Sequence, residues 1–388
     1  MWFFRSPEIV FGEFALNHLT TIQGRKALII TDQNIVKLGF ADLVKDKLAE
    51  AGIETAVFAE VEPDPSLQTA QRGAREAEGF QPDWIIGLGG GSCMDTAKAA
   101  WFLYERPDMD LRELSPFESL GLRAKARLVA IPTTSGTGAE VTMASVLTDT
   151  EEKRKVALGS GELVPDLAIV DPIFTMNLPP EITADTGMDV LTHAIEGYSC
   201  NWHNDFTDGL CLKAIQLVFD YLPRAYENGA DDLVAREKMH NAAAIAGLGF
   251  GNSFAALAHA LGHSLGAAFH VPHGRAVGLF LPYTIEFGAN AGEGRYADIA
   301  RFLGLPVDDG DLGAASLVAA TLNLAQSIGM PTSIRALGIS PEDLNQALPA
   351  LIDNTETDTQ MVSSCRVPDT NEVEALFRYA YDGKSIDF

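Results

Sequence analysis

The sequence lacks the segments that would export the chain or anchor it in a membrane. A membrane-spanning helix needs about 20 apolar residues, and a signal peptide needs an uninterrupted apolar core. No run of that length occurs, and the opening MWFFRSPEIVFGEF is interrupted by Arg5, Glu8 and Glu13. We therefore expect neither a signal peptide nor a membrane span, and we expect a cytoplasmic protein.

Cysteine and basic residues are also scarce. None of the four cysteines forms a Cys-x-x-Cys pair, which argues against a disulfide framework and against a Cys-rich zinc site. Lys and Arg total 28 against 53 Asp and Glu, so the net charge is −25. Nucleic acids and anionic membranes are bound by clustered basic residues, so we expect neither kind of partner.

Apolar residues are plentiful, at 47% of the 388 residues, and they follow two patterns. In the first half, continuous apolar runs alternate with helical patterns such as 39–51 and 66–78. Such runs are typical of parallel strands buried on both faces. The predicted strands are 26–32, 55–61, 83–90, 127–134 and 166–172. After residues 177–182 the apolar residues recur at helical spacing. We predict a Rossmann-like parallel-sheet α/β domain over residues 1–178 and an all-helical domain over 179–388.

A glycine-rich turn follows the third predicted strand, in WIIGLGGGSCMDTAK (84–98). Gly89, Gly90 and Gly91 let a ligand approach the backbone, and the helix that follows offers free N–H groups to a phosphate. Ser92 and Asp95 have the Ser-x-x-Asp spacing of a capping box. The stretch fits neither GxGxxG nor the P-loop. A capped tight turn is the simpler explanation, but three adjacent glycines favour phosphate binding.

Two further features favour a dinucleotide. The segment IPTTSGTGAEVT (131–142) is a second strand exit whose hydroxyls and glycines suit a nucleotide, although such clusters are also common in ordinary loops. Asp32 ends an early strand and can bind a ribose 2′-hydroxyl while repelling a 2′-phosphate, which favours NAD over NADP. An Asx turn explains Asp32 equally well.

Histidine is concentrated in ALAHALGHSLGAAFHVPHG (256–274), which holds four of the eight histidines in the chain. On one continuous helix His259, His263 and His270 would share a face. Pro272 disfavours continuation of that helix, so His273 is expected just past its end.

An acidic residue and a fifth histidine occur upstream in TGMDVLTHAIEGY (186–198). Asp189 and His193 stand at i and i+4, on one face of an apolar helical segment. Carboxylate and imidazole groups suit Fe²⁺ or Zn²⁺ in an open, catalytic type of site. Any one of these histidines alone is better explained as a core residue, but the cluster with Asp189 and His193 predicts a divalent metal.

Four motifs together resemble those of the iron-containing alcohol dehydrogenases, the metal-dependent group III family. They are GGGSCMDTAK, TTSGTGAEVT, TGMDVLTHAIEGY and HALGHSLGAAFHVPHG, in this order and at these separations. The resemblance covers essentially the whole chain. It implies reversible hydride transfer between a small primary alcohol or diol, or its aldehyde, and NAD(H). It also implies a dinucleotide-binding α/β domain, a helical metal-binding domain as in dehydroquinate synthase, and a homodimer or larger homo-oligomer.

The resemblance also implies roles for single residues. The implied ligands of Fe²⁺, with Zn²⁺ as the alternative, are Asp189, His193, His259 and His273. His263 lines the site and is the candidate to relay a proton, Phe250 faces the substrate, and His270 has no counterpart. The implied cofactor residues are Asp32, Gly89, Gly90, Gly91, Ser92, Asp95, Thr133, Thr134, Thr137 and Lys155. Asp185 and the segment 365–370 depart from the family pattern.

Three alternatives stay open at this stage. Polyol oxidation of the glycerol-dehydrogenase kind resembles this plan with one metal ligand fewer. A lyase of the dehydroquinate-synthase kind, which also uses NAD and a metal, would need a basic cluster, and only Arg275 stands near the predicted site. A non-catalytic metal or nucleotide sensor would show no alcohol-dependent rise in NADH absorbance.

Overall fold

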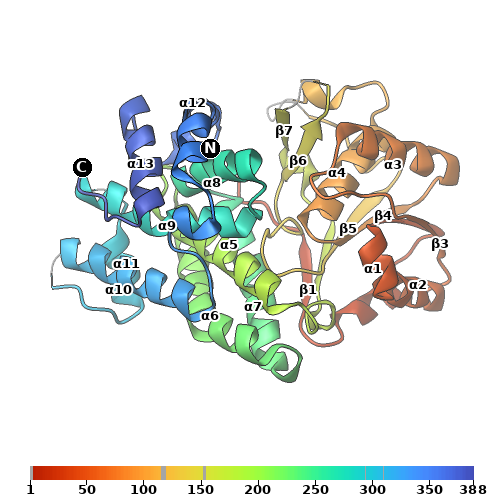
Figure 1. Ribbon diagram of the computed structural model, residues 1–388. Coiled ribbons are helices and arrows are strands. Elements are labelled where there is room, and N and C mark those ends of the chain that lie inside the picture. The colour runs from red at the N-terminus through yellow and green to blue at the C-terminus, as the bar shows by residue number, and fades with distance from the viewer. Residues whose placement is uncertain (1–2, 115–118, 152–153, 293, 309) are drawn as a thin grey trace. The chain divides into compact units, whose positions relative to one another are not determined.

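The computed structural model describes residues 3–114, 119–151, 154–292, 294–308 and 310–388. The chain divides into two compact units, Met1–Asn177 and Leu178–Phe388 (Figure 1). The first unit is α/β, and the described part of the second contains helices and no strand. The predicted fold class is confirmed.

A six-stranded parallel sheet forms the centre of the first unit, in the order β1-β8-β5-β4-β2-β3. Its strands are β1 (Glu8–Phe11), β2 (Lys26–Ile30), β3 (Glu54–Phe58), β4 (Trp84–Gly89), β5 (Arg127–Pro132) and β8 (Leu167–Val170). All five strands predicted from apolar runs are present, each one to three residues shorter than predicted at one or both ends.

Helices cover both faces of this sheet (Figure 1). Leu28 and Ile30 pack with residues of α3 (Leu67–Phe80) and α4 (Gly91–Glu105), whereas the alternate residue Ile29 packs with α1 (Gln33–Lys37) and α2 (Phe40–Glu50). Because both faces are buried, each strand is a continuous apolar run and not an alternating one.

The order of the strands reverses between β2 and β4. From β2 the chain continues to β3 on one side, and from β4 it continues to β5 on the other. Doubly wound sheets bind ligands outside the carboxyl ends of the strands at such a reversal. Asp32 follows β2 and Gly91 follows β4, so both stand at this position.

The first unit also contains elements that apolar runs do not predict. A separate antiparallel hairpin consists of β6 (Ala144–Asp149) and β7 (Arg154–Gly159). The buried ammonium of Lys98 on α4 donates to the carbonyls of Thr142 and Ala144 and so joins the hairpin to the helix. Short 3-10 helices span Ala15–Thr21, Leu111–Glu113, Gly161–Leu163 and Pro172–Phe174.

The second unit is built around α5 (Pro180–Ser199), which is buried at every residue from Gly187 to Ser199. It contacts four other helices, namely α6 (Asp205–Asn228), α7 (Leu233–Phe250), α8 (Leu257–Phe269) and α9 (His273–Asn290). The remaining helices are α10 (Tyr296–Phe302), α11 (Gly310–Ser327), α12 (Pro341–Thr357) and α13 (Thr370–Asp382), with 3-10 helices at Gly229–Asp231, Arg335–Leu337 and Met361–Ser363. Among the described helices, none has the length and apolar character needed to cross a membrane.

Candidate functional site

The glycine-rich turn leads directly into α4. Gly90 is the N-cap of this helix and offers no side-chain cap. The predicted capping box of Ser92 and Asp95 is wrong, because the helix begins at Gly91 and Ser92 lies inside its first turn. The Asp95 carboxylate instead accepts the N–H of Val146 on β6 at 3.0 Å. The N-cap residue therefore supplies no side-chain cap to the first N–H groups of α4, and N–H groups at a helix start suit a phosphate.

The structure brings the two predicted nucleotide segments together. The N–H of Thr133 donates to the carbonyl of Gly89 at 3.0 Å. A Cβ added at Gly91 would lie 3.0 Å from Cγ2 of Thr137, and one at Gly90 would lie 3.6 Å from the Thr134 hydroxyl. Close packing of the two segments is therefore one physical reason for glycine at this turn, beside any bound phosphate.

Asp32 and Lys155 both have partners within the first unit. Asp32 Oδ1 accepts the N–H groups of Asn34 and Ile35, at 2.6 and 3.0 Å, and caps α1. The bond from Asn34 is that of the Asx turn expected as the alternative for Asp32, and the role of Asp32 toward a ribose stays a prediction. The Cys93 thiol donates to the other oxygen at 3.4 Å. Lys155 Nζ lies 2.6 Å from Asp64 Oδ1.

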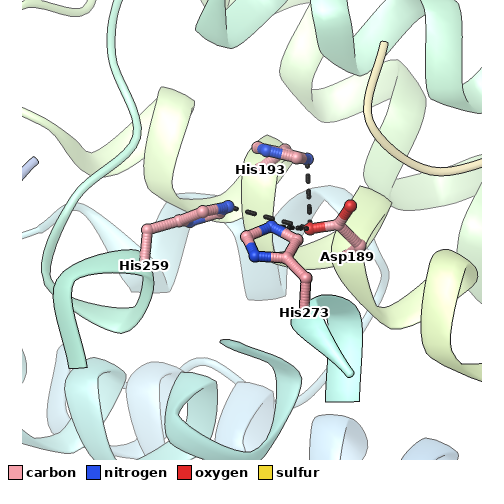
Figure 2. Close-up of side chains that lie close together, drawn as sticks. All are labelled: Asp189, His193, His259 and His273. Carbon is pink, nitrogen blue, oxygen red and sulfur yellow. Dashed lines mark ion pairs between the residues drawn. The ribbon is translucent and has the colours of Figure 1, made fainter. Parts of the chain in front are cut away.

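In the second unit, Asp189 and three histidines converge on one point (Figure 2). Asp189 Oδ1 lies close to one ring nitrogen of each histidine. The distances are 3.6 Å to His193 Nδ1, 3.7 Å to His259 Nε2 and 3.3 Å to His273 Nε2. One ligand atom from each of the four residues lies within 4.8 Å of the others. The side chain of His273 is 43% exposed and the other three are buried, so the cluster is accessible at His273.

The polar atoms of this cluster fit a bound cation. Asp189 Oδ1, His193 Nδ1 and His259 Nε2 are buried and have no hydrogen-bond partner among the described residues. Leaving such an atom unsatisfied costs about 1 to 3 kcal/mol. Three such atoms aimed at one point are the arrangement that a divalent metal would satisfy, and one carboxylate with three imidazoles suits Fe²⁺ or Zn²⁺.

The charges of the cluster also favour a cation. Burial by itself raises the pKa of Asp189, but attraction to His193 and His273 outweighs it and holds the pKa well below its ordinary value. Burial lowers the pKa of His193 to about 3, so this ring is neutral and can offer a lone pair. Burial opposes protonation of His259, but the Glu196 and Asp189 carboxylates raise its pKa to about 9.

The histidines of the predicted cluster occupy two helices. The helix α8 carries His259 and His263 and ends at Phe269, and His270 follows in a left-handed conformation with φ of 55°. The shared face for His259, His263 and His270 is therefore wrong, because the first helix stops before His270. His273 is the first residue of α9, directly after Pro272.

Two glycines allow these helices to approach closely enough for the histidines to meet. Gly262 lies on α8 between His259 and His263, and a Cβ there would lie 2.6 Å from Cγ1 of Val277 on α9. Gly274 follows His273, and a Cβ there would overlap the backbone carbonyl of Asp185 on α5. The small residues of the histidine-rich motif thus set the spacing of α5, α8 and α9.

His263 and Phe250 lie beside the four candidate ligands. The His263 ring centre is 5.2 Å from that of His273, and its Nδ1 is 2.7 Å from Asp358 Oδ2. Partial desolvation lowers the pKa of His263, whose side chain is still 40% exposed, and Asp358 only partly opposes this shift. The Phe250 ring stacks on His193 with centroids 4.0 Å apart.

Sequence reasoning missed Glu196 and Asp358. Glu196 Oε2 lies 2.5 Å from His259 Nδ1. Its position on α5, seven residues after Asp189, is the helical spacing that could have identified it. Asp358 lies 95 positions after His263, and no local pattern links them.

Two family models together match nearly the whole chain. The iron-containing alcohol dehydrogenase model matches residues 6–172, and the C-terminal model of the Fe-containing alcohol dehydrogenase family matches residues 183–381. The chain belongs to the iron-containing alcohol dehydrogenase family. The resemblance seen in the four motifs is confirmed, and the chain is an oxidoreductase of this family.

Two curated relatives illustrate the range of this family. The NADPH-dependent butanol dehydrogenase of Clostridium saccharobutylicum is 38% identical, and the match covers 98% of each chain. The bifunctional aldehyde-alcohol dehydrogenase of Escherichia coli K12 is also 38% identical over 95% of this chain. The chain spans only 44% of the length of that bifunctional relative.

Solved structures share the fold along the whole chain. The iron-containing alcohol dehydrogenase of Thermococcus thioreducens has a TM-score of 0.90 and 31% identity, over 99% of this chain and 100% of that one. The sulfoacetaldehyde reductase of Bifidobacterium kashiwanohense, in complex with NAD⁺, has a TM-score of 0.84 and 29% identity over 98% of both chains.

Proposed function

We propose that this chain catalyses metal-dependent, reversible hydride transfer between a small primary alcohol or diol, or its aldehyde, and NAD(H). The observation that carries the proposal is the set of buried, unpartnered ligand atoms around Asp189. The substrate class is supported by the butanol dehydrogenase relative. Use of NAD is supported by the NAD⁺ complex of the related reductase.

The proposed metal ligands are Asp189, His193, His259 and His273. When bound, the metal supplies Lewis acidity toward the alcohol or aldehyde oxygen, and the nicotinamide accepts or donates the hydride. Asp189, His193 and His259 are buried, which limits the access of bulk water to this point. The more exposed His273 leaves a side from which a small substrate can enter.

His263 is the proposed proton relay. Its Nδ1 is held by Asp358, so Nε2 remains for exchange with the substrate hydroxyl or with water. Asp358 is itself fixed, since its Oδ1 accepts the N–H of Gln360 at 2.8 Å. Phe250 packs on His193 and offers an apolar surface to an aliphatic substrate.

The proposed dinucleotide residues belong to the first unit. Gly89, Gly90, Gly91 and Ser92 would hold the pyrophosphate at the start of α4. Asp95, Lys155 and the hydroxyl loop, with Thr133, Thr134 and Thr137, would contact the rest of the cofactor. The charge of Asp32 favours NAD, whereas the NADPH dependence of the butanol dehydrogenase relative favours NADP as the second candidate.

We also propose a cytoplasmic homodimer or larger homo-oligomer that binds neither nucleic acid nor a membrane. The free, buried thiols of Cys93, Cys200 and Cys211 fit a reducing compartment. The edge strand β1 ends at Phe11, which is 67% exposed, and Phe14, three residues later, is 68% exposed. An apolar sheet edge of this kind suits pairing with a second copy. Light scattering coupled to size-exclusion chromatography measures the assembly.

One experiment tests the main proposal. Metal-free protein is reconstituted separately with Fe²⁺ and Zn²⁺ and assayed with short alcohols and aldehydes, using NAD(H) and NADP(H). We expect metal-dependent turnover of primary alcohols or diols. His259→Ala and His273→Ala should no longer retain metal on gel filtration. Stoichiometric metal in either variant would refute the ligand set. Absence of turnover with every combination of metal, substrate and cofactor would refute the proposed reaction.

A further inference from the structure

A buried glutamate stands behind the candidate metal centre. Glu196 lies on α5, one turn after His193, and its side chain is 5% exposed. Its Oε2 lies 2.5 Å from Nδ1 of His259, whose side chain is 3% exposed. The contact is therefore screened from water on both sides.

The same carboxylate also holds the start of α8. Oε2 accepts the N–H of Ala256 at 2.9 Å, and Oε1 accepts the N–H of Ala258 at 2.6 Å. No side chain of α8 or its N-cap residue caps this helix, so Glu196 supplies the cap from α5. Ala256, Ala258 and His259 thus supply three donors from one short segment, and together they hold both oxygens of Glu196 in place.

We propose that Glu196 is the positioning residue of the metal centre: it keeps a proton on Nδ1 of His259, so that Nε2 is the nitrogen left to face the metal. A carboxylate whose two oxygens both receive N–H groups acts only as an acceptor, so the nitrogen that faces it carries the hydrogen. Nε2 is the atom that lies 3.7 Å from Asp189 Oδ1 and has no partner. A carboxylate at Nδ1 also makes the imidazole a stronger ligand. This inference rests on the ligand set proposed above.

The competing explanation is that Glu196 only caps α8. Glu196→Gln separates the two roles, because an amide has one acceptor oxygen and one NH₂ group. If the NH₂ faces His259, the ring must accept at Nδ1 and carry its hydrogen on Nε2, where a metal cannot bind. If the NH₂ faces Ala258, it opposes the N–H of that residue and His259 keeps a weaker acceptor. Both orientations weaken metal binding.

The measured quantity is the affinity for Zn²⁺, obtained by competition with a chromophoric chelator. We expect Glu196→Gln to lower it by about 10- to 100-fold, as is typical for partners of metal-bound histidines. The matched control is Asp369→Asn, which replaces a carboxylate by an amide at the N-cap of α13, in the same unit, and contacts no histidine in the described structure. This control should bind Zn²⁺ as the unaltered chain does.

A second measurement is made on the unaltered sequence and so does not depend on whether Glu196→Gln folds. In the zinc-loaded protein labelled with ¹⁵N-histidine, His259 should show a proton on Nδ1 that is strongly hydrogen-bonded. Its signal is assigned from its loss in His259→Ala. An unprotonated Nδ1 would overturn the inference.

The outcomes separate this inference from the proposed function. If His259→Ala loses zinc but Glu196→Gln binds it with unaltered affinity, the positioning role is wrong and the ligand set stands. If Asp369→Asn loses as much affinity as Glu196→Gln, the effect comes from helix capping in general and the positioning role is again wrong. If His259→Ala binds zinc normally, the ligand set itself fails.

Discussion

Gly274 is the residue whose replacement most directly tests how the metal centre is built. It follows the candidate ligand His273 at the start of α9 and packs on α5. In Gly274→Ala the new Cβ would overlap the carbonyl oxygen of Asp185 and lie 2.7 Å from its carbonyl carbon, with the Cβ of Asp189 at 3.1 Å. The Asp185 atoms belong to the backbone of α5 and cannot rotate away, so α9 has to move outward.

The size of the effect follows from this geometry. Inserting a methyl group into a packed interior costs about 1 to 3 kcal/mol. The same movement carries His273 away from Asp189, whose nearest ligand atom is now 3.3 Å from His273 Nε2. We therefore expect the free energy of unfolding of the metal-free protein to fall by about 1 to 3 kcal/mol, and the affinity for Zn²⁺ to fall with it.

Gly209→Ala is the matched control. Gly209 lies in α6 of the same unit, and nothing is within 4 Å of a Cβ added there. Alanine in place of an exposed helical glycine raises stability by up to about 1 kcal/mol, so the two variants should differ in sign. Urea denaturation followed by circular dichroism measures both. The close-packing argument would be refuted if Gly274→Ala unfolded at the same urea concentration as Gly209→Ala and bound Zn²⁺ with full affinity.

Three further predictions concern single side chains. His263→Asn should retain stoichiometric metal but lower kcat by about 100-fold or more if the ring relays a proton; an unchanged kcat across the pH range would contradict this role. Asp32→Asn keeps the acceptor that caps α1 but removes the charge, so the ratio of kcat/KM with NAD to that with NADP should fall by about tenfold, or about 1.4 kcal/mol; an unchanged ratio would leave Asp32 as a helix cap only. Burial raises the pKa of Glu162, but hydrogen bonds from two backbone N–H groups and a serine outweigh it and lower the pKa below 4.5. The ionised form is thus favoured in the folded state, so the unaltered chain should be more stable than Glu162→Gln above pH 4.5 and should lose this advantage as the pH falls further; urea denaturation at a series of pH values measures it, and a constant difference would contradict the assignment.

The main elements of the fold could be predicted because their signals are local. The strands of the central sheet are apolar runs, since both faces of that sheet are covered. The hairpin β6–β7 was missed because its burial alternates along Ala144–Asp149, and a short alternating segment is a weak pattern. The capping box at Ser92 was wrong because glycine at the N-cap let the helix begin earlier.

In the candidate site, too, a contact within one helix could be predicted and a contact between helices could not. Asp189 and His193 could be paired from their spacing on one helix. His259 and His273 lie on different helices, and helical periodicity alone grouped His259 with His270 instead. Only the family motif placed His273 in the set before the structure brought the two together.

By itself, the sequence determined the residue types and the family: an α/β half, a helical half, and enough imidazole and carboxylate for a divalent metal. Only the tertiary structure decided which nitrogen of each histidine faces Asp189 and which carboxylates stand behind the rings. Those facts depend on how closely α5, α8 and α9 approach at Gly262 and Gly274. They also depend on the contact of Asp358 with a histidine 95 positions away. Such contacts join residues that are far apart in the chain, so they leave no local pattern from which they could be predicted.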